Sequence, residues 1–124
     1  MNNCIFCNLP PERIVHEYKY FYVIRDAFPV TPLHSLLITK RHVVSYFQCS
    51  KEELNEIPVI LDTQKTELKI LDDKITGFNI GMNIGDDAGQ TIFHCHIHII
   101  PRRHGDTPNP KGGIRGVIPE KQKY

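Results

Sequence analysis

Hydrophobic and polar positions alternate along five short stretches of the chain, each bounded by turn-forming residues. Alternation with a period of two is typical of half-buried strands, because successive side chains of a strand point to opposite faces. The pattern predicts strands at about residues 14–17, 20–25, 34–39, 76–83 and 93–100. Pro29 and Pro32 interrupt the pattern between the second and third strands, which predicts a loop over residues 26–33 because proline has no amide hydrogen for a ladder.

A helical pattern replaces the alternation after residue 50. Ser50-Lys51-Glu52-Glu53 forms a capping box, in which the Ser50 hydroxyl and the Glu53 carboxylate each bind an amide at the helix start. Apolar residues then recur at helical spacing and predict one face for packing on the sheet: Leu54, Ile57, Leu61, Leu68 and Leu71. Pro58 would clash with the preceding turn, so we expect a kink there or a helix that begins later. Together these elements predict an α+β fold.

The composition predicts a single globular domain. The chain has 124 residues, of which 40% are hydrophobic and 23% charged. We expect one domain over residues 1–124, with a core at about 4–103 and a tail at about 104–124. The chain has no run of 18 apolar residues and does not start like a secretory signal. This favours a cytoplasmic protein that does not enter membranes, with its four cysteines in the core or bound to metal rather than in disulfides.

The charge is distributed unevenly along the chain. Residues 102–124 carry six Lys or Arg and two Asp or Glu, whereas the whole chain has a net charge of +1. The basic tail either lies near an anionic substrate or is a solvated terminal segment, and both interpretations stay open. No basic patch with interleaved aromatic residues indicates a nucleic-acid partner.

The most informative segment is residues 93–100, Phe-His-Cys-His-Ile-His-Ile-Ile. As a strand it would place His94, His96 and His98 on one face, at spacings of about 6.8 Å, with Phe93 and the other apolar residues toward the core. Three interpretations compete. The histidines line a wet strand face, one or two of them bind zinc, or the middle imidazole is a nucleophile that attacks phosphorus.

The same run resembles the triad of the histidine triad (HIT) hydrolases, three histidines each followed by apolar residues. Gly89-Gln90-Thr91-Ile92-Phe93 is similar to the family's lead-in, and residues 32–42 resemble its nucleotide-pocket strand. The matches span nearly all of residues 4–103. The resemblance implies a HIT-like fold with a five-stranded antiparallel sheet, one main helix and a short helix. It also implies a two-fold dimer through the main helix and a sheet edge.

The resemblance further implies an enzyme that hydrolyses or transfers purine nucleotides, cleaving at the α-phosphate through a nucleotidyl-histidine. His96 is then the nucleophile, the backbone carbonyl of His94 orients it, and His98 and Thr91 lie near the phosphate and the leaving group. The nucleotide-binding residues that it implies are Asp26, Asn83, Gln90, Phe6, Leu36 and His34, with Phe21 and Phe28 as further pocket walls. Structural roles are also open: a loop cap for Asp26, a turn for Asn83, and core packing for His34 and for the apolar residues of this set.

Cys4 and Cys7 have the CxxC spacing that lets two thiolates bind one zinc ion, provided two more ligands come from elsewhere. The resemblance implies that His42 and His94 are those ligands. A closed Cys₂His₂ set has no open position, so we expect a structural zinc rather than a catalytic one. A pair of thiols without metal and a redox role are the alternatives.

The substrate stays open at the level of sequence. Asn83 is typical of the family branch that cleaves nucleoside phosphoramidates, but the chain has no tryptophan for that branch's tail. Residues 101–106 and 112–119 resemble bacterial members often described as diadenosine tetraphosphate hydrolases. An alternative is a nucleotide-binding or interaction protein that has lost the chemistry, although no triad histidine is replaced.

Overall fold

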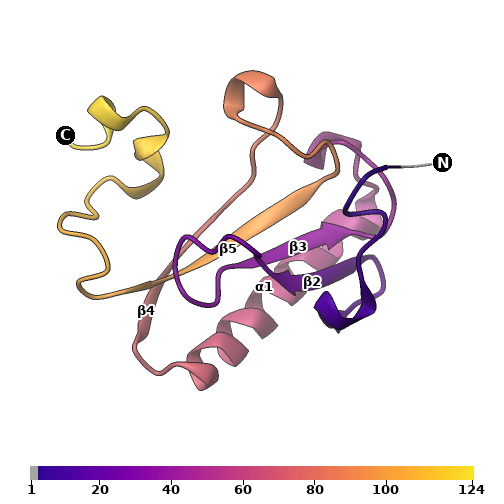
Figure 1. Ribbon diagram of the computed structural model, residues 1–124, viewed down its shortest axis with the longest axis horizontal. Helices are drawn as coiled ribbons and strands as arrows, with labels where there is room; N and C mark the ends of the chain where they lie inside the picture. Colours follow the sequence, from indigo (N-terminus) through magenta and orange to yellow (C-terminus); the bar gives the residue numbers. More distant parts are fainter. Residues whose placement is uncertain (1–2) are drawn as a thin grey trace.

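Five antiparallel strands form one sheet in the order β1-β2-β3-β5-β4, and one long helix, α1, crosses it (Figure 1). The computed structural model describes residues 3–124. The elements are β1 (Ile14–Glu17), β2 (Phe21–Arg25), β3 (Ser35–Thr39), α1 (Lys51–Leu71), β4 (Ile75–Gly81) and β5 (His96–Arg103). Five short 3-10 turns lie between or after them: η1 (Pro11–Arg13), η2 (Tyr46–Gln48), η3 (Asp86–Ala88), η4 (Gly113–Val117) and η5 (Pro119–Lys121). The expected α+β arrangement is confirmed.

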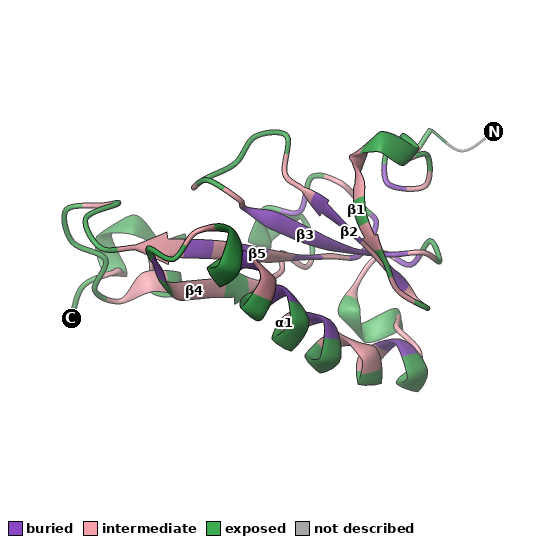
Figure 2. Cartoon of the chain, turned by 90° about the horizontal axis from the view of Figure 1, so that it is seen from below, coloured by how far each residue is buried: buried purple, intermediate pink, exposed green. Residues whose placement is uncertain are grey.

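The sheet has two differently used faces. Paired residues of neighbouring antiparallel strands share a face, so Val23, Leu37 and Ile97 point to one side. They form a buried cluster with Ile60 and Leu68 of α1. Figure 2 shows α1 below the sheet, with its buried positions toward the strands, and the N-terminal segment on the opposite side. The helix therefore covers one face and leaves the other for a site.

The second face of the sheet carries the histidines. Leu36 pairs with His98, and Ile38 pairs with His96, so these four side chains share the face that α1 does not cover. Phe6 packs there with Leu36 and Ile38 in a second buried cluster. The N-terminal segment thus forms a wall beside the histidines.

Helix α1 starts where the capping box predicts. The Glu53 amide donates to the Ser50 hydroxyl at 3.1 Å, and the Ser50 amide donates to the Glu53 carboxylate at 2.6 Å. The helix continues through Pro58, so the expectation of a later start is wrong. The cap supplies partners for the first amides, and α1 is held to the sheet through Ile60 and Leu68 on both sides of its middle.

The helix face differs in part from the predicted one. Leu68 is buried and Leu61 packs against the core as expected, but Leu71 is 57% exposed because the helix ends there. Gln64 is buried although it is polar, since its amide binds Glu67 and its carbonyl accepts from Arg25.

Strand β5 begins later than the alternation predicts. Residues before His96 do not continue the ladder, because the Cys95 amide donates to the Val43 carbonyl in the turn after β3. Phe93 consequently lies 43% exposed instead of in the core, while Ile97 and Ile99 are buried as predicted. The ring of His94 is fully buried and leaves the row formed by His96 and His98.

The basic tail folds back beside the sheet. Its Ile114 side chain lies so close to β4 that a Cβ on Gly81 would meet it at 3.3 Å. Among residues 3–124, no helix is long and apolar enough to cross a bilayer.

Candidate active site and metal centre

The imidazole of His96 is held in one tautomer by its own strand. Its Nδ1 lies 2.8 Å from the backbone carbonyl of His94. Because a carbonyl only accepts, Nδ1 carries the hydrogen, and in the neutral ring Nε2 keeps its lone pair. The Phe6 ring packs edge-on against His96 with 5.0 Å between ring centroids, which limits rotation of the imidazole. Nε2 of His96 is thereby available as a nucleophile.

A chain of hydrogen bonds fixes the neighbouring histidines. The Val30 amide donates to Nδ1 of His34 at 3.0 Å, so the proton of neutral His34 is on Nε2. That Nε2 lies 2.9 Å from Nδ1 of His98 and donates to it. In the neutral ring of His98 the remaining proton is therefore on Nε2, which makes this atom a hydrogen-bond donor.

Burial keeps both of these rings uncharged. It lowers the pKa of His34, and the Asp26 carboxylate opposes this only in part. It lowers the pKa of His98 to about 4, helped by the neighbouring His96 and His34. At neutral pH the pair therefore acts as a relay of neutral donors rather than as a cationic site.

A pocket of about 370 Å³ opens on this face of the sheet, with His96 and His98 in its wall. It brings together most of the residues implied by the resemblance: Phe6, Asp26, Phe28, His34, Leu36, Asn83 and Thr91. The apolar side chains suit a base, and the hydroxyl, amide and carboxylate suit a ribose phosphate.

Asp26 combines a structural contact with a place in the pocket. One carboxylate oxygen accepts from the Phe28 amide at 2.9 Å, which caps the loop. The other oxygen lies 3.5 Å from Nε2 of His34. The two interpretations from sequence, loop cap and pocket residue, are therefore compatible.

Gln90 and Phe21 do not line this pocket. The Gln90 side chain accepts from the Gly85 amide and donates to the carbonyls of Val44 and Ile92, so it fastens the loop before the triad. Phe21 is fully buried in the cluster under α1, which corrects its expected place in the purine pocket. Its register explains the difference, because it shares a face with Val23 and not with Ile24.

Sequence reasoning missed several lining residues: Ile5, Arg13, Ile24, Ala27, Val30 and Ile92. The alternation of β2 could have placed Ile24, since it pairs with Leu36 on the pocket face. No sequence signal indicates Arg13, which lines the pocket and whose guanidinium donates to the Arg25 carbonyl at 3.0 Å.

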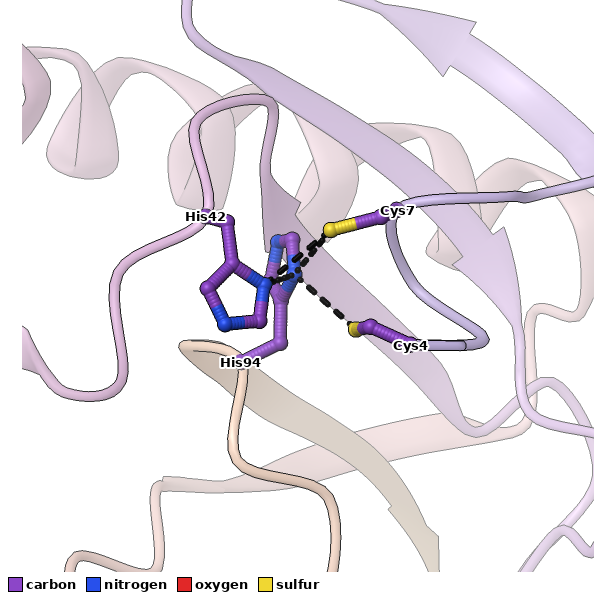
Figure 3. Close-up of side chains that lie close together, drawn as sticks. All are labelled: Cys4, Cys7, His42 and His94. Atoms are coloured by element: carbon purple, nitrogen blue, oxygen red, sulfur yellow. Dashed lines mark hydrogen bonds between the residues drawn. The ribbon is translucent and has the colours of Figure 1, made fainter. Parts of the chain in front are cut away.

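Four potential metal ligands meet at the other end of the triad segment. Figure 3 shows Cys4 and Cys7 of the N-terminal loop facing His42 and His94. Nδ1 of His94 lies 3.4 Å from each cysteine sulfur and 3.1 Å from Nδ1 of His42. The Cys7 sulfur lies 3.0 Å from Nδ1 of His42. All four donor atoms lie within 4.8 Å of one another.

The chemistry of this donor set fits zinc. Nε2 of His94 lies 2.7 Å from the Thr39 carbonyl and donates to it, so Nδ1 presents a lone pair to the cysteines. Burial lowers the pKa of His94 and keeps the ring neutral, as a metal ligand must be. Tetrahedral zinc with bonds of about 2.0 to 2.3 Å separates its ligand atoms by about 3.3 to 3.8 Å, close to the spacings present here.

A second group of potential ligands, Asp26, His34 and His98, does not suit a metal. A metal on Nε2 of His34 would need the proton on Nδ1, where it would oppose the hydrogen of the Val30 amide. The Val30 amide therefore leaves His34 with a hydrogen-bond donor at Nε2. The Thr39 carbonyl, by contrast, leaves His94 with a lone pair at Nδ1 for a metal.

Comparison with known proteins agrees with this arrangement. The family model for the HIT domain matches residues 9–105. An uncharacterized 16.1 kDa HIT-like protein of Mycoplasma pneumoniae is 34% identical over 106 residues, which cover 82% of this chain and 72% of the relative.

Two solved structures are similar over most of the chain. One is a zinc-bound histidine triad family protein from Mycobacterium smegmatis, with 32% identity and a TM-score of 0.75, covering 86% of this chain and 80% of that one. The other is the diadenosine triphosphate hydrolase of Plasmodium falciparum, with 29% identity and a TM-score of 0.75, covering 91% of this chain and 74% of that one.

Proposed function

This chain belongs to the histidine triad (HIT) family, and from that premise we propose that it hydrolyses purine nucleotide conjugates at the α-phosphate. The conjugates are dinucleoside polyphosphates or nucleoside phosphoramidates. The observation that carries the proposal is the bond from Nδ1 of His96 to the His94 carbonyl, which leaves Nε2 unprotonated in the pocket wall. The similarity to a diadenosine triphosphate hydrolase supports the same class of reaction.

The proposed reaction has two steps. Nε2 of His96 attacks the α-phosphorus, a P–N bond to the histidine forms, and the bond to the leaving group breaks. The leaving group departs with the electron pair of the broken bond, a polyphosphate as its anion and a protonated phosphoramidate nitrogen as the free amine. Nε2 of His98 donates a hydrogen bond to it, and Thr91 hydrogen-bonds a phosphate oxygen. Water then attacks the phosphorus of the nucleotidyl-histidine, and the P–N bond breaks with its electron pair returning to Nε2 of His96. The nucleoside monophosphate leaves with the oxygen of the water, whose released proton passes to solvent.

The remaining pocket residues bind the nucleotide. Phe6 and Leu36 enclose a purine ring, Asp26 accepts from the ribose hydroxyls, and Asn83 donates to the phosphate. His34 acts through His98, because it holds the proton on the far nitrogen of that ring. Gln90 contributes indirectly by holding the loop before Thr91, through its bonds to the Val44 and Ile92 carbonyls.

We also propose a structural zinc held by Cys4, Cys7, His42 and His94. When bound, the ion would supply no catalysis, because the four protein ligands close its coordination. His94 connects the centre with the reaction, since its ring faces the cysteines while its carbonyl orients His96. A clip at this point fixes the start of β5 and, with it, the position of the nucleophile.

Three further expectations from the sequence stay predictions: a cytoplasmic location, one domain over residues 1–124, and a homodimer through α1 and a sheet edge. Residues 1 and 2 lie outside the described part of the chain. β4 is an edge strand with β5 as its neighbour on one side, so its outer edge is where a continuous sheet would form.

Turnover of two substrates tests the function. We expect the protein to release AMP from diadenosine tetraphosphate or adenosine phosphoramidate, and His96→Ala to lower kcat by at least about a thousandfold, since it removes the nucleophile. His104→Ala is the matched control, because His104 is an exposed histidine outside this pocket. Binding of AMP without product from either substrate would instead identify a nucleotide-binding protein.

A further inference from the structure

The face of β5 that carries the triad continues beyond it. Because side chains alternate, Ile100 and Arg102 follow His96 and His98 on the same side. These two residues form the floor of a second hollow of about 580 Å³, which we call the tail groove. Val30 lines both the tail groove and the nucleotide pocket, so the two hollows adjoin.

Two segments form the walls of the tail groove. One is the loop before β3, which is fastened to β5 by the bond from the Thr31 hydroxyl to the Pro101 carbonyl at 2.7 Å. The other is the tail, through Ile114 and Val117. Ile114 rests on β4 at Gly81, where the missing side chain leaves it room. The basic tail therefore has a defined place next to the site.

The charges in the tail groove are already balanced. Arg102 forms a two-pronged ion pair with Asp106, with distances of 2.8 and 2.7 Å, and its third nitrogen donates to the Asn79 side chain at 2.7 Å. This pairing holds the pKa of the Asp106 carboxyl far below its usual range. A paired guanidinium is a weak site for another anion. The groove suits an uncharged group rather than a phosphate.

The lining gives the chemical class of that group. Ile100, Ile114 and Val117 offer apolar surface, and the Asn79 and Gln122 side chains offer polar atoms beside it. A nucleobase has apolar faces and hydrogen-bonding edges, which match such a lining. We propose that the tail groove binds the second nucleoside of a dinucleoside polyphosphate, while the first occupies the pocket at His96. This inference rests on the proposed function.

The distance between the two places favours long substrates. Ile100 lies four residues after His96, or roughly 13 Å along the strand. A phosphate chain can bridge this gap, whereas the leaving group of adenosine phosphoramidate is a single amine that cannot reach the groove. The tail groove therefore selects dinucleoside polyphosphates over phosphoramidates.

A matched pair of variants tests the inference. Ile114→Asp places a charge in the groove, and Ile118→Asp places the same charge on the same tail outside it. The two isoleucines are similarly exposed, at 60% and 51%. For Ile114→Asp we expect KM for diadenosine tetraphosphate to rise about tenfold relative to KM for adenosine phosphoramidate, which corresponds to about 1.4 kcal/mol of binding free energy. Ile118→Asp should leave the ratio of the two KM values unchanged.

An inhibitor separates the contribution of the second nucleoside from that of the phosphates. Adenosine tetraphosphate has the phosphate chain but no second nucleoside, so the rise of its inhibition constant with Ile114→Asp measures repulsion of the phosphates alone. The rise of KM for diadenosine tetraphosphate should exceed it. Val117→Asp replaces Ile114→Asp if the latter does not fold. Equal KM ratios for groove and control variants would overturn the tail-groove proposal while leaving the hydrolase proposal intact. Absence of turnover of both substrates by the unmodified protein would instead contradict the proposed function.

Discussion

The protonation of His98 decides which of its nitrogens offers a hydrogen to the pocket. The groups around it are His96, His34 and Asp26, and His34 donates to its Nδ1. A proton on that Nδ1 would meet the hydrogen of His34 and break the relay. The relay in the folded protein therefore depends on a neutral His98.

This relay predicts a pH dependence of stability. An unfolded histidine binds a proton near pH 6.5, whereas the pKa of His98 in the folded protein is about 4. Between these values the unfolded state binds more protons, so the free energy of unfolding falls as the pH is lowered from 6.5 toward 4. Urea unfolding at several pH values should show a smaller fall for His98→Gln, by up to about 1.4 kcal/mol per pH unit. Parallel curves for variant and parent would contradict the assigned protonation.

For single residues, the sequence could predict which residues belong to the site better than it could predict where their side chains point. The resemblance to the HIT family, carried by the triad and the segments before it, implied most of the pocket residues, Asp26 and His34 among them. It could not show that Gln90 turns its amide into the loop, because that depends on which carbonyls the folded backbone leaves near it. It could not reveal Arg13, whose place depends on a contact with the Arg25 carbonyl.

At the scale of elements, the N-terminus of α1 is stabilised by its capping box. Ser50→Ala removes the acceptor of the Glu53 amide and should lower the free energy of unfolding by about 1 kcal/mol in urea titrations. Thr66→Ala is the matched control, because the Thr66 hydroxyl lies on the exposed side of the helix and binds only the Asp62 carbonyl one turn back. Equal losses for the two variants would show that the cap contributes nothing specific.

The N-terminal loop and the start of β5 depend on the proposed zinc clip. Cys7→Ser removes one of four ligands, so we expect purified protein with less than stoichiometric zinc and a clearly lower Tm. Cys49→Ser is the matched control, since Cys49 lies outside the cluster, with its sulfur 3.9 Å from that of Cys95. Metal analysis that finds no zinc in the parent protein, or an unchanged Tm for Cys7→Ser, would contradict the clip.

The ends of an element were predictable where nearby residues determine them. They were less predictable where contacts between distant segments determine them. The capping box gave the start of α1, and alternation gave β1 with both ends correct. The alternation of residues 93–95 is equally regular, yet these residues leave the ladder because Cys95 bonds to Val43 and His94 turns to Thr39 and the cysteines. Pro58 shows the opposite case, in which packing overrides a local signal against a helix.

At the scale of the whole molecule, the sheet has a free edge at β4, the strand paired with the triad strand. If two copies join there, light scattering should give about twice the chain mass of 14.3 kDa at micromolar concentration. A monomeric mass over the working range of concentrations would contradict the dimer and leave the site unaffected.

In the proposed reaction, Nε2 of His96 is the atom that bonds to phosphorus. The most direct test mixes the protein briefly with an adenine nucleotide conjugate that is radiolabelled at its α-phosphate. The labelled protein is then mapped by peptide under alkaline conditions, which preserve phosphorus–nitrogen bonds. We predict a transient label on the peptide that contains His96, which disappears as AMP is released and never forms in His96→Ala. Turnover without any labelled protein, or label on a different residue, would contradict it.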